Sequence, residues 1–436
     1  MIYYNNYKQV FLNLLVLTFP ISFLIGRVFV ETFLIIFSIY TIINLKKWKN
    51  YIIDKNHIII LLFFYYLAIN LSTLLNLETL TKTTDKTLLL KSFSNFRFII
   101  YIISVWYVLE EIKFKKNVFI FAISIYFLFL VDGYTQFFSG QNLLGYQLLS
   151  TGRITGIFED EQIFGSYIQK VVPLFLILFF LIFKKNNFSF VLLLFLLSSS
   201  SIIIFLSGDR SPLILFIFFL ILCLIYLSDL KKIILLNFLI SALITSIIIF
   251  SGVGKNLKSL DKRYNLNSEY NTLINTSEEP SEKFKFLPRD YYGHYLVVKE
   301  MLKDNLIFGK GIRSFRVLCR GNLGNLYPVE NGVCSTHPHN YFLQSLSAGG
   351  LIAFFFLSLI FLTFAFKMLT LFFSLFNKQK NNNNILKLAT ITVFVFFWPI
   401  IPTGNFFSNW VAGFNCFAIG LFLFINFKFQ KKHSTN

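Results

Sequence analysis

Long apolar runs are the feature of this sequence that most restricts the fold of the chain. They recur along most of its 436 residues, and each is roughly twenty residues long, the length at which a helix crosses about 30 Å of hydrocarbon. The composition agrees, with 56% hydrophobic residues, 14% charged residues and 58 phenylalanines. A soluble domain cannot bury so much apolar surface, and a backbone inside a bilayer has to satisfy its own hydrogen bonds. The sequence therefore predicts an all-α polytopic membrane protein.

Twelve of these runs are predicted to cross the membrane. They lie at residues 9–25, 28–45, 57–76, 96–111, 118–132, 166–183, 188–206, 211–228, 233–251, 348–366, 386–402 and 409–426. Short basic loops follow the even-numbered runs, among them KKWKN at 46–50 and IKFKKN at 112–117. Such loops stay on the cytoplasmic side, so both chain ends are predicted to be cytoplasmic. These loops largely explain the formal net charge of +19, and no nucleic-acid partner is expected.

The stretch 252–347, between the ninth and tenth predicted spans, is long and rich in charges. It is predicted to be a large loop domain on the opposite, periplasmic side. Its second part is predicted to form an amphipathic helix that lies against the membrane or the mouth of the bundle and ends at a pair of glycines. The residues of its apolar face and the two glycines are Tyr295, Val298, Met301, Leu302, Gly309 and Gly311.

This plan divides the chain into three parts. Residues 1–150 hold the first five spans. Residues 151–366 hold the central core with the large loop, and residues 367–436 hold the last two spans and a cytoplasmic tail.

A polar segment with two histidines, CSTHPHNYF at 334–342, runs directly into an apolar span. Pro338 suits the first turn of a helix, where its missing N–H costs nothing, and Thr336 or His337 is the expected cap. His339 then falls in the first turn, where the helix N-terminus attracts anions and disfavours an imidazolium. The pattern favours a neutral histidine that acts as a base or hydrogen-bond partner. The alternative is a set of ordinary residues at the level of the lipid headgroups.

Two arginines on the same predicted side are candidates for binding an anion. Arg153 lies in STGRITGIF before the sixth span, and Arg210 lies in the turn between the seventh and eighth spans. Both are flanked by glycine and small polar residues, and a guanidinium binds phosphate oxygens bidentately without a metal. The alternative is that each side chain reaches out to lipid headgroups. The acidic run 159–161 is interpreted as a solvated loop, although one of its carboxylates could orient Arg153.

Two of the four cysteines, Cys319 and Cys334, lie in the large loop just before the histidine segment. In an oxidising periplasm the simplest interpretation is a disulfide that holds the loop beside His337 and His339. A zinc site would need these two histidines as further ligands, and the spacing of the four residues matches no common zinc pattern. No metal or other cofactor is expected.

Taken in their order along the chain, four segments resemble the O-antigen ligase and polymerase superfamily of bacterial membrane proteins. In THPHNYFLQSLSAGG, His339, Asn340 and Gly350 stand where that family has a His-Asn pair, an apolar helix and a glycine. Ala353 stands where the family often has a second glycine. The other segments are TGRITGIFEDEQIFGSY and SGDRSPL, which resemble its two arginine-bearing stretches, and KDNLIFGKGIRSF, which resembles its loop helix with a Gly-x-Gly turn. The resemblance covers residues from about 150 to 360.

The resemblance implies a GT-C-like, multi-pass glycosyltransferase of the bacterial inner membrane, with an active site that faces the periplasm. Its reaction would move a glycan from an undecaprenyl-diphosphate carrier to a sugar hydroxyl, without a metal, in lipopolysaccharide biosynthesis. An O-antigen ligase, whose acceptor is lipid A-core, is favoured over a polymerase that extends another carrier-linked repeat. The residues to which the resemblance gives roles are Arg153 and Arg210 on the diphosphate, His339 as base or acceptor-positioning group, and His337, Arg289 and Asn340 as second-tier substrate-binding candidates.

Two other classes of function remain open on the sequence. One is a transporter for a lipid-linked sugar, which would need ionisable groups at mid-depth in its spans, and these spans have few. The other is a non-catalytic membrane scaffold, in which mutation of His339 or Arg210 would leave glycan output unchanged.

Overall fold

The computed structural model describes residues 2–44, 56–78, 87–184, 186–255, 257, 260, 264, 289–320, 334–376 and 383–434. These residues form helices joined by turns and loops. Among them, Gln141 and Gln147 form an isolated antiparallel β-bridge that is not part of a longer strand. The basic loop at 46–50 and most of the first part of the predicted loop domain lie outside the described residues.

The α-helices follow one another along the whole chain. They are α1 (Ile2–Thr18), α2 (Ser22–Ile25), α3 (Arg27–Ile43), α5 (His57–Leu75), α7 (Leu88–Phe93), α8 (Arg97–Glu111), α9 (Lys116–Ser139), α10 (Phe164–Ile182), α11 (Asn187–Leu206), α12 (Arg210–Tyr226), α13 (Lys231–Ser251), α15 (Arg289–Leu302), α16 (Ser314–Arg320), α18 (Tyr341–Phe376), α19 (Asn384–Phe396) and α20 (Asn409–Ser434). Short 3-10 helices lie between some of them: η1 (Phe19–Ile21), η2 (Ser94–Phe96), η3 (Gly156–Phe158) and η4 (Ser228–Leu230).

Each of the twelve predicted runs coincides with a helix, and together they make the architecture of a polytopic membrane protein. Within the described residues, nine helical segments are long and apolar enough to cross a membrane. The other three predicted spans fall on α3 and α12, of 17 residues each, and on α19, of 13 residues. A helix rises about 1.5 Å per residue, so these three are short for a full crossing. The count of twelve therefore stays a prediction.

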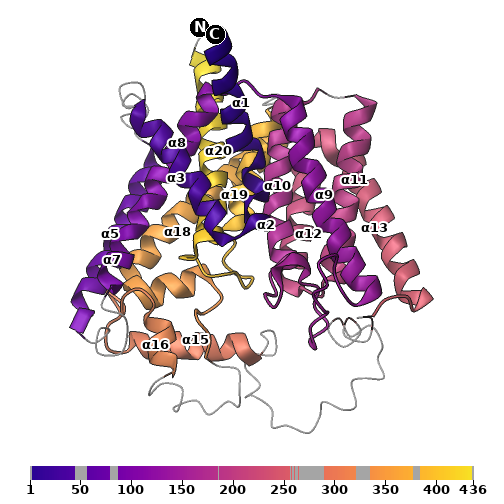
Figure 1. The fold of residues 1–436 in the computed structure, drawn as a ribbon. Helices are drawn as coiled ribbons and strands as arrows, with labels where there is room; N and C mark the ends of the chain where they lie inside the picture. Colours follow the sequence, from indigo (N-terminus) through magenta and orange to yellow (C-terminus); the bar gives the residue numbers. More distant parts are fainter. Residues whose placement is uncertain are drawn as a thin grey trace.

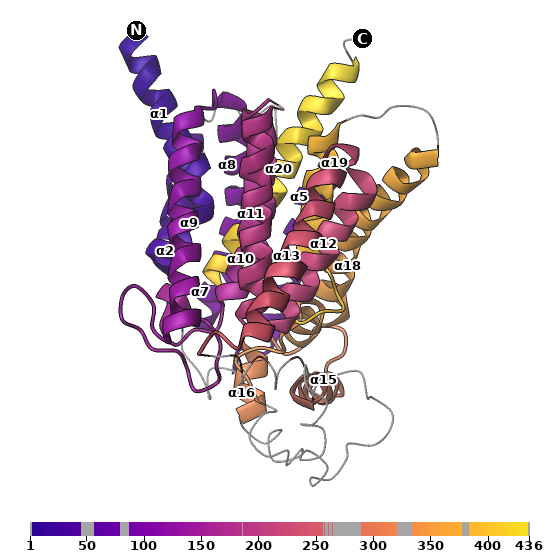
Figure 2. The same cartoon turned by 90° about the vertical axis from the view of Figure 1, so that its right-hand side faces the viewer.

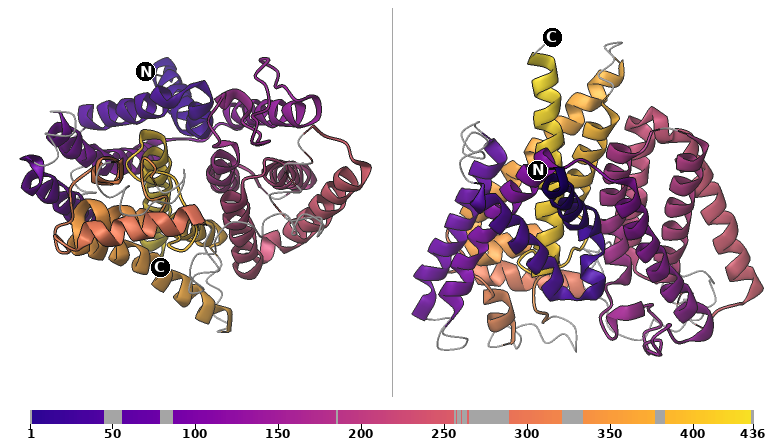
Figure 3. Two further views of the ribbon diagram at one scale, coloured as in Figure 1. Left: turned by 90° about the horizontal axis from the view of Figure 1, so that it is seen from below. Right: turned by 45° about the horizontal axis from the view of Figure 1, so that its top comes forward.

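Both chain ends lie at one end of the helix bundle, and α15 and α16 lie at the other (Figures 1 and 2). The turn between α8 and α9 is at the end with the termini, because Lys8 of α1 donates a 2.8 Å hydrogen bond to Glu111 at the last residue of α8. The basic loop 112–117 therefore lies on the same side as both termini, as the alternation of basic loops predicts. Seen from below, α15 lies flat across the opposite end of the bundle (Figure 3).

Helices that are far apart in the sequence share one core. Helix α5 packs against α18, and both α3 and α8 pack against α20. The aromatic side chains do much of this packing: Phe19 stacks on Phe417 at 4.3 Å between ring centroids, and Phe23 stacks on Trp410 at 4.7 Å. Helices from the three predicted parts of the chain thus pack against one another in one bundle.

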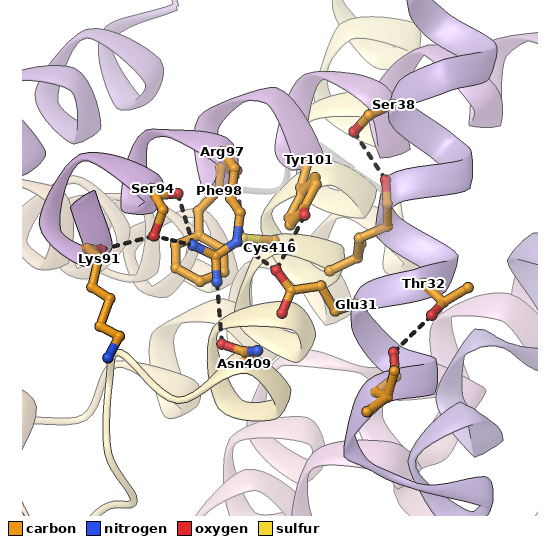
Figure 4. A network of polar contacts seen from close by, with 12 residues as sticks. Glu31, Thr32, Ser38, Lys91, Ser94, Arg97, Phe98, Tyr101, Asn409 and Cys416 are labelled. Atoms are coloured by element: carbon orange, nitrogen blue, oxygen red, sulfur yellow. Dashed lines mark hydrogen bonds and ion pairs between the residues drawn. The ribbon is translucent and has the colours of Figure 1, made fainter. Parts of the chain in front are cut away.

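An ion pair closes the loop-side end of α3, α8 and α20 (Figure 4). The Arg97 guanidinium at the start of α8 donates to the Glu31 carboxylate of α3 at 2.5 Å and to the Asn409 side chain of α20 at 3.2 Å. Arg97 also donates to the Ser94 hydroxyl and carbonyl at 2.8 Å. A carboxylate within an apolar run is costly unless it is paired, and this network supplies the pairing of Glu31.

Candidate functional site

Helix α15 covers the loop-side end of the bundle near the histidine segment. His294, Val297, Val298 and Met301 are buried, and they follow the i, i+3, i+4, i+7 spacing of one helical face. This face packs against α16 and against the first part of α18. The predicted helix is confirmed, with two corrections: it ends at Leu302 rather than at the glycines, and Tyr295 is 46% exposed.

The glycine pair serves a different purpose, which is to attach this segment to α18. Helix α18 is interrupted at Gly350, where φ is 61° and ψ is −158°. The Leu306–Gly311 segment fills the break, and its backbone is bonded to that of α18: Lys310 N–H donates to Ser347 and Gly311 N–H to Ala348, both at 2.9 Å, while Leu351 N–H donates to Leu306 at 3.0 Å. A Cβ on Gly309 would lie 2.4 Å from the Gly350 nitrogen, so a side chain at position 309 would prevent the two backbone segments from lying this close together.

The histidine segment ends just before α18, which corrects the expected position of His339. Asn340 caps the helix, because its Oδ1 accepts hydrogen bonds from the N–H groups of Phe342 and Leu343 at 2.9 and 3.1 Å. The first helical residue is Tyr341, so the predicted cap at Thr336 or His337 is wrong. The helix starts after Asn340 rather than at Pro338, because the Asn340 side chain accepts hydrogen bonds from two N–H groups of the first turn.

His339 therefore precedes the first turn instead of lying in it. Its φ of 49° is left-handed, and its carbonyl accepts a 2.7 Å hydrogen bond from the N–H of Thr403. Asn340 Nδ2 donates to the carbonyl of Pro399 at 2.6 Å. Two bonds thus fix this turn against the loop between α19 and α20, and the positive φ is held by its surroundings.

Three imidazole rings meet at this turn, and we call His294, His337 and His339 the histidine cluster. The His339 ring centroid lies 4.1 Å from that of His337 and 5.3 Å from that of His294, with an interplanar angle of 22° to the latter. His339 Nε2 and Ser335 Oγ share a 3.0 Å hydrogen bond. His337 Nδ1 and Thr336 Oγ1 share another of 2.9 Å.

The packing of His294 and His337 favours neutral rings. Burial and the neighbouring His339 together lower the pKa of His294 to about 4. Burial also lowers the pKa of His337 to about 3, and His339, His294 and Arg316 contribute to that shift. Both rings are therefore uncharged at pH 7, because a positive charge among close imidazoles and a guanidinium is doubly disfavoured.

His294 is the member of the histidine cluster that sequence reasoning did not single out. One signal was present in the sequence, since the residue lies on the apolar face of an amphipathic helix, where a polar side chain is out of place. The connection of that helix to a segment more than forty residues away was not visible in any local pattern.

A pocket of about 260 Å³ opens beside His339. Its walls come from α15, from the start of α18 and from the loop before α20, and apart from His339 and Asn340 they are mainly apolar. The lining side chains include Tyr295, Phe342, Leu343, Leu346, Phe354, Pro399, Ile400 and Pro402. A ligand in this pocket would contact His339 directly.

Of the two predicted arginines, Arg153 lies against the buried carboxylate of Asp209, the residue that directly precedes Arg210. Arg153 Nε lies 3.5 Å from Asp209 Oδ1, and Arg153 Nη1 donates to Gln162 at 2.7 Å. Asp209 Oδ2 accepts a 3.0 Å hydrogen bond from the N–H of Gly165, at the start of α10. Arg210, the next residue along the chain, opens α12 and is exposed. Within the described residues Arg210 forms no ion pair.

Gly165 permits this arrangement, since a Cβ there would lie 2.8 Å from Asp209 Oδ2. The carboxylate near Arg153 is thus Asp209 and does not come from the acidic run. Glu159 and Asp160 are exposed, and Glu161 pairs with Arg27. The interpretation of that run as a solvated loop agrees with their exposure.

The remaining candidates are positioned separately. The structure joins Cys319 of α16 to Cys334 by a disulfide, with 5.5 Å between their Cα atoms, which ties α16 to the histidine segment. The bonded sulfurs leave no thiolates for the zinc arrangement considered above, and none of the described residues form a metal-ligand group of three or more. Arg289 is the first residue of α15, and its side chain lies outside the described part. No contact among the described residues joins the arginine pair to the histidine cluster.

Comparison with known proteins identifies the central part of the chain. Residues 193–358 match a family model described as O-antigen ligase, and no curated protein matches the chain. The matched region includes Arg210, α15, the glycine turn and the histidine cluster, while Arg153 precedes it. Residues 193–358 thus match an O-antigen ligase domain, which supports the resemblance of this part of the chain to the O-antigen ligase superfamily.

Proposed function

We propose that this protein transfers a glycan from an undecaprenyl-diphosphate carrier to a sugar hydroxyl at the periplasmic face of the bacterial inner membrane. The observation that carries the proposal is the extent of the O-antigen ligase match, which runs from before Arg210 to beyond His339. The start of α12, which Arg210 opens, and the start of α18, which His339 precedes, lie at the end of the bundle at which α15 lies. The chain termini and the basic loop 112–117 lie at the opposite end.

The arginines would bind the diphosphate. Arg210 is exposed at a helix N-terminus, where the backbone also favours an anion. Arg153 is oriented by Gln162 and Asp209, so its guanidinium is held in place before any ligand arrives. A diphosphate is a leaving group whose charge grows as its bond to the sugar breaks, and preorganised cations stabilise that charge most. This chemistry needs no metal ion.

His339 would accept the proton of the acceptor hydroxyl. Its place at the pocket allows contact with a ligand, and it directly precedes the N-terminus of α18, where a positive charge is disfavoured. General-base assistance of this kind contributes roughly 10²–10⁴-fold to a rate. His337, Arg289 and Asn340 would have secondary roles in substrate binding, and the bonds of Asn340 support a part for it in holding the turn.

We favour the ligase, in which the acceptor is lipid A-core, over the polymerase, in which it is another carrier-linked repeat. The lipopolysaccharide of a deletion strain separates the two. Loss of all glycan-capped bands supports the ligase, and survival of caps with a single repeat supports the polymerase.

The reaction itself is tested with purified protein and an undecaprenyl-diphosphate donor. His339→Ala should abolish transfer and leave donor binding largely intact, because the base acts on the acceptor. Arg153→Ala and Arg210→Ala should weaken both transfer and donor binding. His57→Ala is the matched control, since this exposed histidine starts α5 far from the site. Full transfer by His339→Ala, or activity that a chelator removes, would contradict the proposal.

A transporter or scaffold would give a different result. A scaffold would show no transfer in the purified system, and neither His339→Ala nor Arg210→Ala would change the glycan pattern of cells. A transporter would move the labelled donor across vesicles without an acceptor.

A further inference from the structure

His294 is buried in an unusual place for a histidine. It is 3% exposed and lies on the inner face of α15, among Val297, Val298 and Met301. Its ring faces that of His339 at 5.3 Å with an interplanar angle of 22°, and it meets the Phe315 ring edge-on at 5.7 Å. The chain has five histidines, and three of them meet at this point.

We propose that His294 is a positioning residue for His339: its ring is the flat surface that sets the plane of the reactive imidazole and keeps water away from it. The proposal rests on the proposed role of His339 as the base. It goes beyond that role because it assigns a function to α15, the helix that carries His294 across the end of the bundle.

Two features of the packing support this role. The His339 turn is held through its backbone by Thr403, which fixes the main chain but leaves rotation about the side-chain bonds. Stacking on His294 and the hydrogen bond to Ser335 restrict that rotation. Helix α15 is in turn held by the glycine turn and by the contacts of Met301 with α16 and α18. The position of the His294 ring is therefore set by the fold and not by the ligand.

Among the described residues, few charged or titratable groups lie around His339, and the nearest is the His337 ring, at 4.1 Å between centroids. Helix α15 supplies His294 and, at the pocket, Tyr295. Helix α16 supplies Arg316, which acts on His337. The loop that bonds to the His339 backbone, at 399–405, contains no charged residue. Cover of the His339 ring by the buried His294 ring favours the neutral imidazole on that side, and water admitted by loss of the His294 ring would favour the imidazolium.

Three substitutions at position 294 test the inference with purified protein. His294→Phe keeps a flat ring and the burial, so kcat should stay within about threefold of wild type. His294→Leu keeps the burial without the flat ring, and kcat should fall about tenfold or more, as expected when a reacting group is misplaced. His294→Ala should lower kcat further and should also move the acid limb of the pH profile of kcat/KM to higher pH. The sign follows because a base works in its neutral form, and solvation of the imidazolium raises the pKa of the base.

Donor binding should be unchanged in all three variants, because the arginines are assigned to that task. A residue that only stabilised the fold would change the yield and the melting temperature without moving the acid limb. The inference is overturned if His294→Leu retains wild-type kcat, or if His294→Phe is impaired as strongly as His294→Leu. It is also overturned if His294→Ala leaves the acid limb in place.

Parallel measurement of His339→Ala separates two kinds of failure. If His339→Ala is active, the proposed base is wrong and the role of His294 falls with it. If His339→Ala is inactive and His294→Leu has normal kcat, the base assignment stands and only the inference about His294 fails.

Discussion

At the scale of single residues, the two neighbours Asp209 and Arg210 have opposite environments. The Asp209 side chain is 4% exposed and is held by Arg153 and by the N–H of Gly165. Arg210, the first residue of α12, is exposed. The Asp209 carboxylate thus orients the half-buried Arg153 guanidinium, while the neighbouring Arg210 stays exposed.

The first prediction concerns the shape of the Arg210 side chain. Arg210→Lys keeps the positive charge but loses the planar fork that binds two phosphate oxygens. If Arg210 binds the diphosphate bidentately, transfer should fall at least about tenfold, because one good charge-assisted hydrogen bond is worth about 1.5–3 kcal/mol. The measurement is kcat/KM for the carrier-linked donor. An arginine that only reaches lipid headgroups would be replaced by lysine without loss, and that result would remove Arg210 from the site.

At the scale of elements, the break in α18 organises the loop-side end of the protein. The Leu306–Gly311 segment enters the break at Gly350 and attaches α15 to α18 through backbone hydrogen bonds. Helix α16 is attached to the histidine segment by the Cys319–Cys334 disulfide. Both attachments act on the elements that surround His339.

The glycine contact gives the second prediction. Gly309→Ala should destabilise the protein, because Gly309 has a φ of 69° and its Cβ would lie 2.4 Å from the Gly350 nitrogen. Gly252→Ala is the matched control, with a φ of 67° and nothing within 4 Å of the added Cβ. The control carries the backbone strain alone, about 1–2 kcal/mol, and Gly309→Ala should cost a further 1–3 kcal/mol or so for the overlap. Equal melting temperatures for the two variants would show that the contact is not tight.

The disulfide gives the third prediction. Protein purified from the membrane without reductant should yield a cross-linked peptide pair containing Cys319 and Cys334, as detected by mass spectrometry. Closing a loop of this length is worth about 3 kcal/mol in the chain-entropy model, so Cys334→Ser should lower the melting temperature. The buried Cys223 and Cys416 serve as internal controls, since they should be found as free thiols after unfolding. Alkylatable thiols at both loop positions would refute the prediction.

At the scale of the whole molecule, the bundle has two distinct ends. The termini and the basic loop 112–117 lie at one end, and α15, α16 and the histidine cluster lie at the other. The polar groups of the candidate site are thus gathered at one end of the bundle. The positive-inside rule assigns the first end to the cytoplasm.

This orientation is the fourth prediction. Single cysteines placed at two exposed positions, Asp160→Cys at the loop end and Lys113→Cys at the end with the termini, should react differently in intact spheroplasts. A membrane-impermeant thiol reagent should modify the first and spare the second, and permeabilisation should make both reactive. Modification of Lys113→Cys in intact spheroplasts would reverse the assigned orientation.

The sequence alone determined the features that depend on local composition. Apolar runs of membrane-spanning length predicted where the helices lie, because a backbone in lipid has few alternatives to a helix. The regular placement of basic loops predicted that both termini share one side. The order of short motifs predicted the family, since each motif is read from neighbouring residues.

The tertiary structure decided what depends on contacts between distant residues. The cap of α18 is Asn340 rather than Thr336, and the turn that presents it is held by hydrogen bonds to the backbone of Thr403 and Pro399, about sixty residues further along the chain. The pairing of Arg153 with Asp209 and the stacking of His294 on His339 each join segments more than forty residues apart. Such contacts arise from how helices pack, and a side chain's partners across a bundle are not encoded in its neighbours along the chain.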